Sequence, residues 1–310
     1  MTVTLQWLRG MRAMFPLAAT LLALTSPPAR ADSVLFVGNS FTYAANSPVR
    51  FFRHETVTDL NVGGVGGVPA LFKAFSTEAG RSDTVSLETA GGQGLDWHWK
   101  NKADVFKQSW DVVVLQSYST LDHAHPGDPG ILIQATQDIA APLTRSNPKV
   151  QIHLLATWTR ADQTYRPGGH WSGKTVDAME KDIRAGYDRA AAACPSVKDV
   201  IPVGQAWNRA IVTGFADADP YDGIDAGKID LWSFDNYHAS MYGYYLDALT
   251  VFGDLTGLDP RSLGRGESCA DALGISGDQA ASMEQIAYDE LTAEGNLSLK
   301  PFKARPLAGL

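Results

Sequence analysis

The chain has 310 residues, of which 45% are hydrophobic, and its formal net charge is −8. That apolar share is ordinary for a globular protein and argues against a disordered chain. An acidic chain without a cluster of Lys and Arg is also a poor candidate for binding nucleic acid.

The first 31 residues have the features of a secretory signal peptide. Two arginines precede the apolar stretch 14–24, and Ala29-Arg30-Ala31 offers small residues to a signal peptidase. The stretch is shorter than the roughly 20 residues that a membrane-spanning helix needs. We therefore predict cleavage near Ala31 and a secreted or periplasmic protein that is a monomer, without stable membrane insertion. Loss of residues 1–31 changes the net charge from −8 to −11, because three arginines and no acidic residue are removed.

Short apolar runs alternate with longer amphipathic segments in residues 32–310. The apolar runs predict buried strands at 33–39, 84–90, 111–116, 150–158 and 199–203. The amphipathic segments predict helices at 48–58, 68–78, 130–145, 173–193, 206–212, 241–255 and 277–294. This alternation is typical of a parallel sheet with helices on both faces. We predict an α/β protein with one catalytic domain over 32–310, a three-layer α/β/α sandwich around a five-stranded parallel, flavodoxin-like sheet.

Ser40 directly follows the first predicted strand, within Gly38-Asn39-Ser40-Phe41-Thr42. Its hydroxyl would lie at the carboxyl end of a strand, where open α/β sheets bind their ligands. Near the other end of the chain, Asp235 and His238 stand three residues apart, just before a predicted helix. That spacing lets the carboxylate orient the imidazole while His238 takes the Ser40 proton. Either motif alone is more often an ordinary turn or cap, but together they predict a catalytic triad.

Two further segments predict hydrogen-bond donors for an oxyanion hole, beside the N–H of Ser40 itself. The second strand ends in Ala90-Gly91-Gly92-Gln93-Gly94, from which we choose the Gly92 N–H, with Gly91 and Gly94 as alternatives. A tight turn with no catalytic role would need the same glycines. The third strand runs into Gln116, whose amide could donate to the same oxygen or could brace the loop.

These blocks resemble the SGNH, or GDSL-like, hydrolase superfamily. Gly38-Asn39-Ser40 stands where the family name has Gly-Asp-Ser, and the segment from Asp235 to Ser240 resembles the last block. The chain is a variant, because Gln116 stands where the third block usually has an asparagine. The resemblance implies acyl transfer in two steps, in which Ser40 attacks an ester carbonyl and water later hydrolyses the acyl-enzyme.

Trp97 and Trp158 follow the second and fourth predicted strands, so we predict that they line the substrate cleft and stack on sugars. Aromatic residues are equally ordinary core material. Asp122-His123-Ala124-His125 lacks the further ligands that a metal would need, and we predict neither a metal nor a cofactor. A disulfide between Cys194 and Cys269 is chemically permissible in an exported protein, and the sequence leaves it open.

These observations favour a secreted serine esterase that removes O-acetyl or other short acyl groups, with an ester substrate such as an acetylated glycan. Three alternatives stay open. The protein could be a lipase or thioesterase-like esterase for longer acyl chains, a catalytically silent glycan-binding protein, or an acyltransferase of the same fold.

Overall fold

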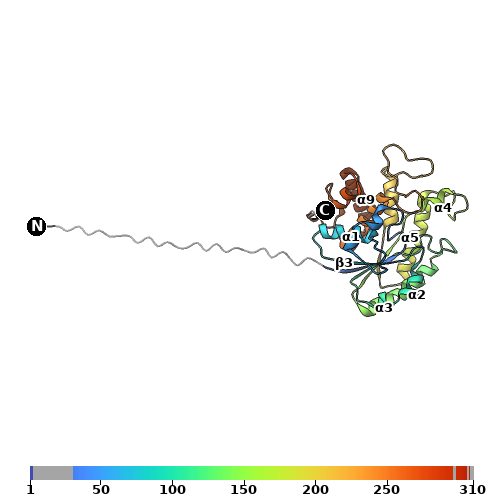
Figure 1. Ribbon diagram of the computed structural model, residues 1–310, viewed down its shortest axis with the longest axis horizontal. Coiled ribbons are helices and arrows are strands. Elements are labelled where there is room, and N and C mark those ends of the chain that lie inside the picture. The colour runs from blue at the N-terminus through green and yellow to red at the C-terminus, as the bar shows by residue number, and fades with distance from the viewer. Residues whose placement is uncertain (3–30, 296–297, 306, 308–310) are drawn as a thin grey trace.

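The computed structural model describes residues 1–2, 31–295, 298–305 and 307 (Figure 1). The predicted signal peptide lies almost wholly outside the described residues, so it stays a prediction. The described strands form one sheet, in which every neighbouring pair is parallel, in the order β2-β3-β1-β4-β5-β6. Their bounds are β1 Ser33–Gly38, β2 Thr58–Asp59, β3 Thr84–Thr89, β4 Val112–Leu115, β5 Gln151–Leu155 and β6 Val197–Ile201.

The five predicted strands are all present, and their order confirms the flavodoxin-like arrangement. The sheet has a sixth strand, because the two-residue β2 pairs with β3 at the edge. Two residues are too few to form the apolar run or the alternating pattern from which a strand is predicted.

The predicted helix over 48–58 is wrong. Two 3-10 turns, η1 Pro48–Phe51 and η2 His54–Thr56, occupy this segment instead. Arg53 lies between them with a φ of 42°, in the left-handed region that a continuous α-helix cannot pass through.

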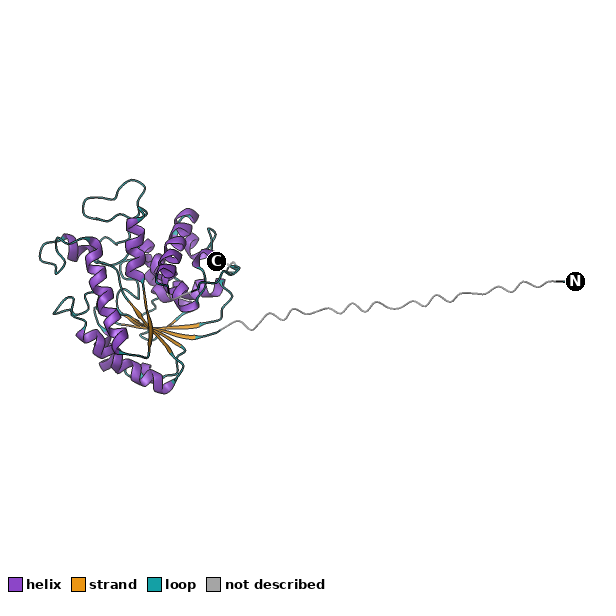
Figure 2. Ribbon diagram, turned by 180° about the vertical axis from the view of Figure 1, so that it is seen from behind, coloured by secondary structure: helices purple, strands orange, loops and turns teal. Residues whose placement is uncertain are grey.

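Helices cover both faces of the sheet, as Figure 2 shows. One core cluster buries side chains of α2 Leu95–Lys102, α3 Gly130–Ser146 and α5 Val176–Ala193. The other buries side chains of α1 Gly67–Glu78, α6 Val203–Val212, α7 Met241–Thr256 and α9 Gly277–Ala293, together with the short α4 Ala161–Tyr165 and α8 Ser268–Leu273. The three-layer α/β/α prediction is confirmed, while α2, α4 and α8 are too short to have stood out in the sequence. In the described part of the chain, no helix is long and apolar enough to cross a membrane.

Alternation along β1 explains why its sequence is apolar throughout. Val34 and Phe36 join the core on the α1 side, whereas Leu35 and Val37 join the core on the α3 side. Successive side chains of a strand point to opposite faces, so a strand that is covered twice needs apolar residues at every position.

The two cysteines are buried free thiols on opposite sides of the sheet. Cys194 belongs to the α3-side core and Cys269 to the α1-side core. The disulfide that the sequence left open is therefore not formed.

Candidate active site

Ser40 lies two residues beyond the end of β1, between the carboxyl ends of two neighbouring strands. In the sheet register, Gly38 is opposite Thr89 of β3, and Val37 is opposite Leu115 of β4. This is the edge where the sequence placed the nucleophile, and Ser40 is 8% exposed there. Both predicted sources of oxyanion donors therefore begin beside it.

The loop after β1 has no room for a side chain at Gly38. A Cβ built on Gly38 would stand 2.1 Å from Thr42 Oγ1 and 2.6 Å from Gln116 Oε1. The start of α1 closes on the same loop, because a Cβ on Gly67 would meet the Thr42 carbonyl oxygen at 2.5 Å. Two glycines thus allow the loop that carries Ser40 to fold tightly against its neighbours.

Asp235 and His238 contact each other in the way that their spacing predicts. Asp235 Oδ2 lies 2.6 Å from His238 Nδ1, and Asp235 Oδ1 accepts the backbone N–H groups of Tyr237 at 3.1 Å and His238 at 2.9 Å. Partial burial disfavours ionisation of the carboxyl, but the hydrogen bonds from His238 and Tyr237 outweigh it and lower the pKa of Asp235. The carboxylate therefore stays charged and orients the imidazole through Nδ1.

Asn46 joins the Ser40 loop to the Asp235 loop. Its Nδ2 donates to Asp235 Oδ2 at 2.7 Å and lies 3.4 Å from His238 Nδ1. Its carbonyl oxygen accepts the Ser233 hydroxyl at 2.9 Å. Asn46 has a φ of 60°, a left-handed conformation that asparagine tolerates better than most residues. Asn46 could not be predicted from the sequence, because nothing in the local pattern points to a partner so far along the chain.

Two aromatic rings pack against the His238 imidazole. The Tyr237 ring lies 4.1 Å from it and the Phe41 ring 5.5 Å, measured between ring centroids. His238 Nε2 is buried and has no hydrogen-bond partner among the described residues, so the Ser40 hydroxyl is not bonded to it in this structure. Catalytic hydrogen bonds are often long or poorly aligned in unliganded enzymes and tighten with substrate. Phe41 follows Ser40 directly, so its contact with His238 brings the two parts of the predicted triad together.

The glycine segment after β3 forms a tight turn beside the Ser40 loop. Gln93 N–H donates to the Ala90 carbonyl at 3.2 Å, and Gly92 has a φ of 72° at the third position of that turn. A type II turn needs glycine or asparagine at this position. Gly92 is exposed, and a Cβ on it would meet no atom within 4 Å. The structure thus leaves open space at Gly92, where the sequence predicted an oxyanion donor.

Gln116 braces the loops instead of facing the site, which contradicts its predicted role as an oxyanion donor. Its Oε1 accepts the backbone N–H of Asn39 and the Thr42 hydroxyl, both at 3.0 Å. Its Nε2 donates to the Ser117 carbonyl, and the side chain is only 1% exposed. The amide is turned toward the two loops that it joins. The bracing role, which the sequence left as the alternative, agrees with these contacts.

Asn39 ties three loops together through one amide group. Its Nδ2 donates to the carbonyl oxygens of Gln93 at 2.9 Å and Ser117 at 3.1 Å. Its Oδ1 accepts the N–H of Phe41 at 3.2 Å. An aspartate could not donate to those carbonyls at neutral pH, so the asparagine before Ser40 has a structural reason.

Trp158 is fully buried, which contradicts its predicted role in stacking on sugars. Its ring stacks on Trp207 at 4.6 Å with the planes 3° apart, and the Phe41 ring lies 4.5 Å away. Its Nε1 donates to the Tyr237 carbonyl at 3.3 Å. Trp158 thus supports the residues that hold His238. An aromatic residue at the end of a strand has the same sequence pattern whether its ring lies in the core or lines a cleft, so the pattern could not distinguish the two.

Trp97 is half-buried in the first turn of α2, which starts directly after the glycine segment. Its N–H donates to the Gly94 carbonyl at 3.1 Å. No contact between described residues joins its ring to Ser40 or His238, so its role in substrate binding stays a prediction. Phe234, which the sequence did not single out, is 83% exposed beside Asp235.

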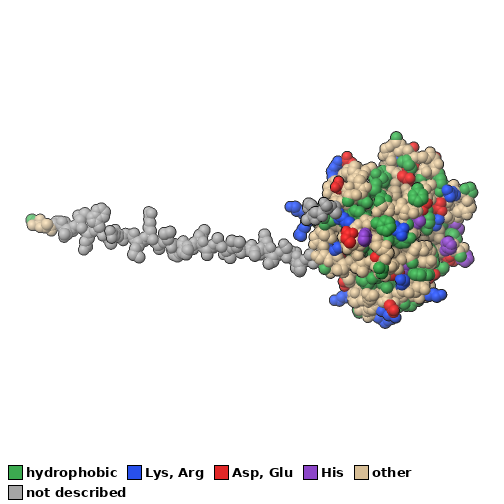
Figure 3. Space-filling model, viewed as in Figure 1, with side chains coloured by type: hydrophobic (Ala, Val, Ile, Leu, Met, Phe, Trp, Pro, Cys, Tyr) green, Lys and Arg blue, Asp and Glu red, His purple; other side chains and the backbone are tan. Residues whose placement is uncertain are grey.

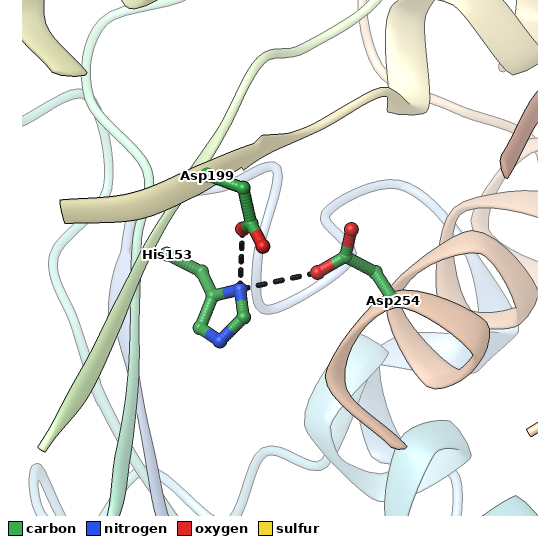
Figure 4. A group of neighbouring side chains, drawn as sticks. All are labelled: His153, Asp199 and Asp254. Carbon is green, nitrogen blue, oxygen red and sulfur yellow. Dashed lines mark hydrogen bonds and ion pairs between the residues drawn. The ribbon is translucent and has the colours of Figure 1, made fainter. Parts of the chain in front are cut away.

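A second cluster of titratable side chains lies between α7 and the strands β5 and β6, at the β6 edge of the sheet (Figure 4). His153 of β5, Asp199 of β6 and Asp254 of α7 offer atoms within 4.8 Å of one another, residue types that can also bind a metal ion. Both carboxylates approach the same nitrogen, with Asp199 Oδ1 at 2.6 Å and Asp254 Oδ1 at 3.1 Å from His153 Nδ1. Burial disfavours the charged imidazole, but the two carboxylates outweigh it and raise the pKa of His153. These contacts are those of an imidazolium between two acids.

The segment from Asp122 to His125 forms a turn of its own. Asp122 Oδ1 accepts the backbone N–H groups of Ala124 at 2.6 Å and His125 at 3.0 Å.

Figure 3 shows acidic and basic side chains interspersed over the visible face of the molecule. That distribution agrees with the lack of a basic cluster in the sequence.

Comparison with solved structures shows which proteins share this fold. A DUF4886 family protein from Bacteroides uniformis ATCC 8492 is similar with a TM-score of 0.59 at 17% identity, over 86% of this chain and 97% of that chain. This likeness shows the fold. A putative SGNH hydrolase from Slackia heliotrinireducens follows with a TM-score of 0.48 at 19% identity, over 73% of this chain and 99% of that chain.

The comparison also finds an acetyl-xylooligosaccharide esterase from Geobacillus. Its TM-score is 0.46 at 15% identity, over 74% of this chain and 95% of that chain. No family model matches the chain, and no curated protein matches it. The likeness to the DUF4886 family protein thus concerns the fold alone.

Proposed function

We propose that this protein is a serine esterase in which Ser40 is the nucleophile, His238 the base and Asp235 the orienting acid. One observation carries the proposal. The Asp235–His238 hydrogen bond of 2.6 Å is joined through Asn46 to the loop that holds Ser40 at the carboxyl edge of the sheet. These contacts support a site to which two ends of the chain contribute the three groups that acyl transfer needs.

In the proposed reaction, His238 Nε2 removes the proton of Ser40 as its oxygen attacks the ester carbonyl. The backbone N–H groups of Ser40 and Gly92 donate to the oxygen on which negative charge develops. His238 then passes the proton to the leaving alcohol, and water hydrolyses the acyl-enzyme by the same route. Asp235 stays ionised throughout and stabilises the imidazolium, which agrees with its lowered pKa.

The substrate part of the proposal rests on the sequence. An acidic chain with a predicted signal peptide and with aromatic residues after its strands favours short acyl esters of carbohydrate. We infer that O-acetyl or similarly short esters, carried on carbohydrate, are the substrates. Export as a monomer after cleavage near Ala31 is part of the same proposal.

A chain-length series of nitrophenyl esters together with acetylated polysaccharides tests this proposal. Wild type should prefer acetate over octanoate and should release acetate from the polysaccharides, whereas Ser40→Ala should do neither. A preference for octanoate would favour an esterase for long chains. Transfer of acetate to an added sugar, faster than hydrolysis, would favour an acyltransferase. Equal turnover by wild type and Ser40→Ala would remove Ser40 from the mechanism.

A further inference from the structure

Phe234 is an exposed aromatic ring directly beside the acid of the proposed triad. It is 83% exposed, while the rings of Phe41 and Trp158 nearby are buried. A single exposed apolar side chain is normal on a protein surface and does not by itself indicate a binding site. Position distinguishes Phe234, because consecutive Cα atoms are about 3.8 Å apart and its neighbour Asp235 contacts His238.

The backbone on both sides of Phe234 is fixed. Ser233 accepts the N–H of Asn236 at 2.8 Å, which closes a tight turn with Phe234 as its second residue. The Ser233 hydroxyl donates to the Asn46 carbonyl, and Asp235 accepts from the Asn46 amide. The ring is therefore presented to solvent from a rigid turn, which lowers the entropy that a ligand must overcome on binding it.

The side of the site on which Phe234 lies follows from the proposed chemistry. His238 donates its proton to the oxygen of the leaving alcohol, so the alcohol must lie over the imidazole. The oxyanion donors come from the β1 and β3 loops, so the carbonyl oxygen lies toward them. Phe234 lies in the loop 233–238, which the hydrogen bond of 2.8 Å from the Ser233 N–H to the His238 carbonyl closes. We therefore assign Phe234 to the His238 side of the site, where the alcohol leaves.

We propose that Phe234 is a specificity residue that stacks on one sugar ring of the alcohol part of the ester. The inference rests on the proposed esterase function and deepens it. The residues beside Phe234 in this loop are polar, namely Ser233, Asp235 and Asn236, and they suit a hydroxylated ring. A long apolar chain would need a continuous apolar surface, which a single phenyl ring does not supply. A flat ring offers its face to the C–H side of a pyranose and leaves the hydroxyl groups to the polar neighbours.

The test compares two acetate esters that differ only in the alcohol, an acetylated xylooligosaccharide and vinyl acetate. The readout is the ratio of kcat/KM for the oligosaccharide to kcat/KM for vinyl acetate. Phe234→Ala should lower this ratio about tenfold through KM for the oligosaccharide, and Phe234→Trp should retain it. Val212→Ala, which truncates an 85% exposed side chain at the end of α6, is the matched control and should keep the wild-type ratio.

The outcomes separate the two proposals. If wild type hydrolyses both esters and Phe234→Ala keeps the wild-type ratio, the stacking role is overturned while the esterase function stands. If wild type hydrolyses neither ester, the esterase function itself fails. An equal loss on both esters with a lowered melting temperature would show a structural role for Phe234, and would also overturn the stacking role.

Discussion

The Asn46 amide donates a hydrogen bond of 2.7 Å to Asp235 Oδ2, although the two residues are 189 positions apart in the sequence. The same carboxylate oxygen contacts His238 Nδ1. Asn46 therefore links the loop of the proposed nucleophile to the acid that orients the proposed base.

Asn46→Gly should lower kcat about tenfold with little change in KM. Glycine accepts the left-handed φ of 60° at this position, so the substitution removes the amide without straining the backbone. Loss of one hydrogen bond to a charged group corresponds to roughly 1.5–3 kcal/mol. Steady-state kinetics on a nitrophenyl acetate measure the effect. A wild-type kcat in Asn46→Gly would show that the Asp235–His238 pair holds its geometry alone.

Asn39→Asp should destabilise the fold although it restores the residue of the Gly-Asp-Ser pattern. The new carboxylate would face the carbonyl oxygens of Gln93 and Ser117, which now accept hydrogen bonds from the Asn39 amide. Two buried acceptors would lose their donor, at a cost of roughly 2–5 kcal/mol. Urea unfolding at pH 7 gives the free energy. Asn101→Asp serves as the control, because Asn101 is exposed and its amide donates to the carbonyl of Trp97 at an exposed position. Equal stability of Asn39→Asp and wild type would contradict the account of this amide.

Glu180 should make the protein less stable as the pH rises from about 4.5 to about 7. Burial raises the pKa of Glu180 from 4.5 to about 7, so the folded state holds a proton that the unfolded chain has released in that interval. The unfolded chain then binds fewer protons, and the free energy of unfolding falls by roughly 3 kcal/mol over the interval. Glu180→Gln should make the profile less steep, while part of the remaining slope comes from Glu284, whose pKa burial also raises to about 7. The exposed Glu55→Gln should leave the slope unchanged. A profile that keeps its slope in Glu180→Gln would refute the assignment.

We expect the stability of the fold to depend strongly on the imidazole of His153. His153→Leu should lower the free energy of unfolding by roughly 3–5 kcal/mol, because it leaves Asp254 buried without its partner. Adding Asp254→Asn to that variant should recover part of the loss, since the buried charge is then removed. Thermal unfolding with and without Zn²⁺ gives a second readout. A rise of the wild-type melting temperature with Zn²⁺ would favour a metal site over the ion pair.

Local patterns carried the predictions that the structure confirms. β1 and β4 are apolar almost throughout because both faces of the sheet are covered there, and that property can be read from a few consecutive residues. The spacing of Asp235 and His238 is equally local, which is why the sequence could predict their contact. The 48–58 helix failed because the left-handed Arg53 interrupts a segment whose composition suits a helix.

Contacts between distant segments explain what the sequence could not predict. Asn46 has its role only through a partner on another loop. An apolar ring after a strand is compatible with a core or a cleft, and Trp158 lies in the core because Trp207 and Phe41 cover it. The amide of Gln116 could have turned toward the site, but the tight loop at Gly38 places Asn39 and Thr42 within its reach.

Covalent labelling of Ser40 tests the central claim most directly. A fluorophosphonate should modify wild-type protein once, as measured by intact mass, and the modified peptide should contain Ser40. His238→Ala should be labelled much more slowly, and Ser40→Ala should not be labelled at all. Labelling of Ser40→Ala at the wild-type rate would contradict the proposal that Ser40 is the nucleophile.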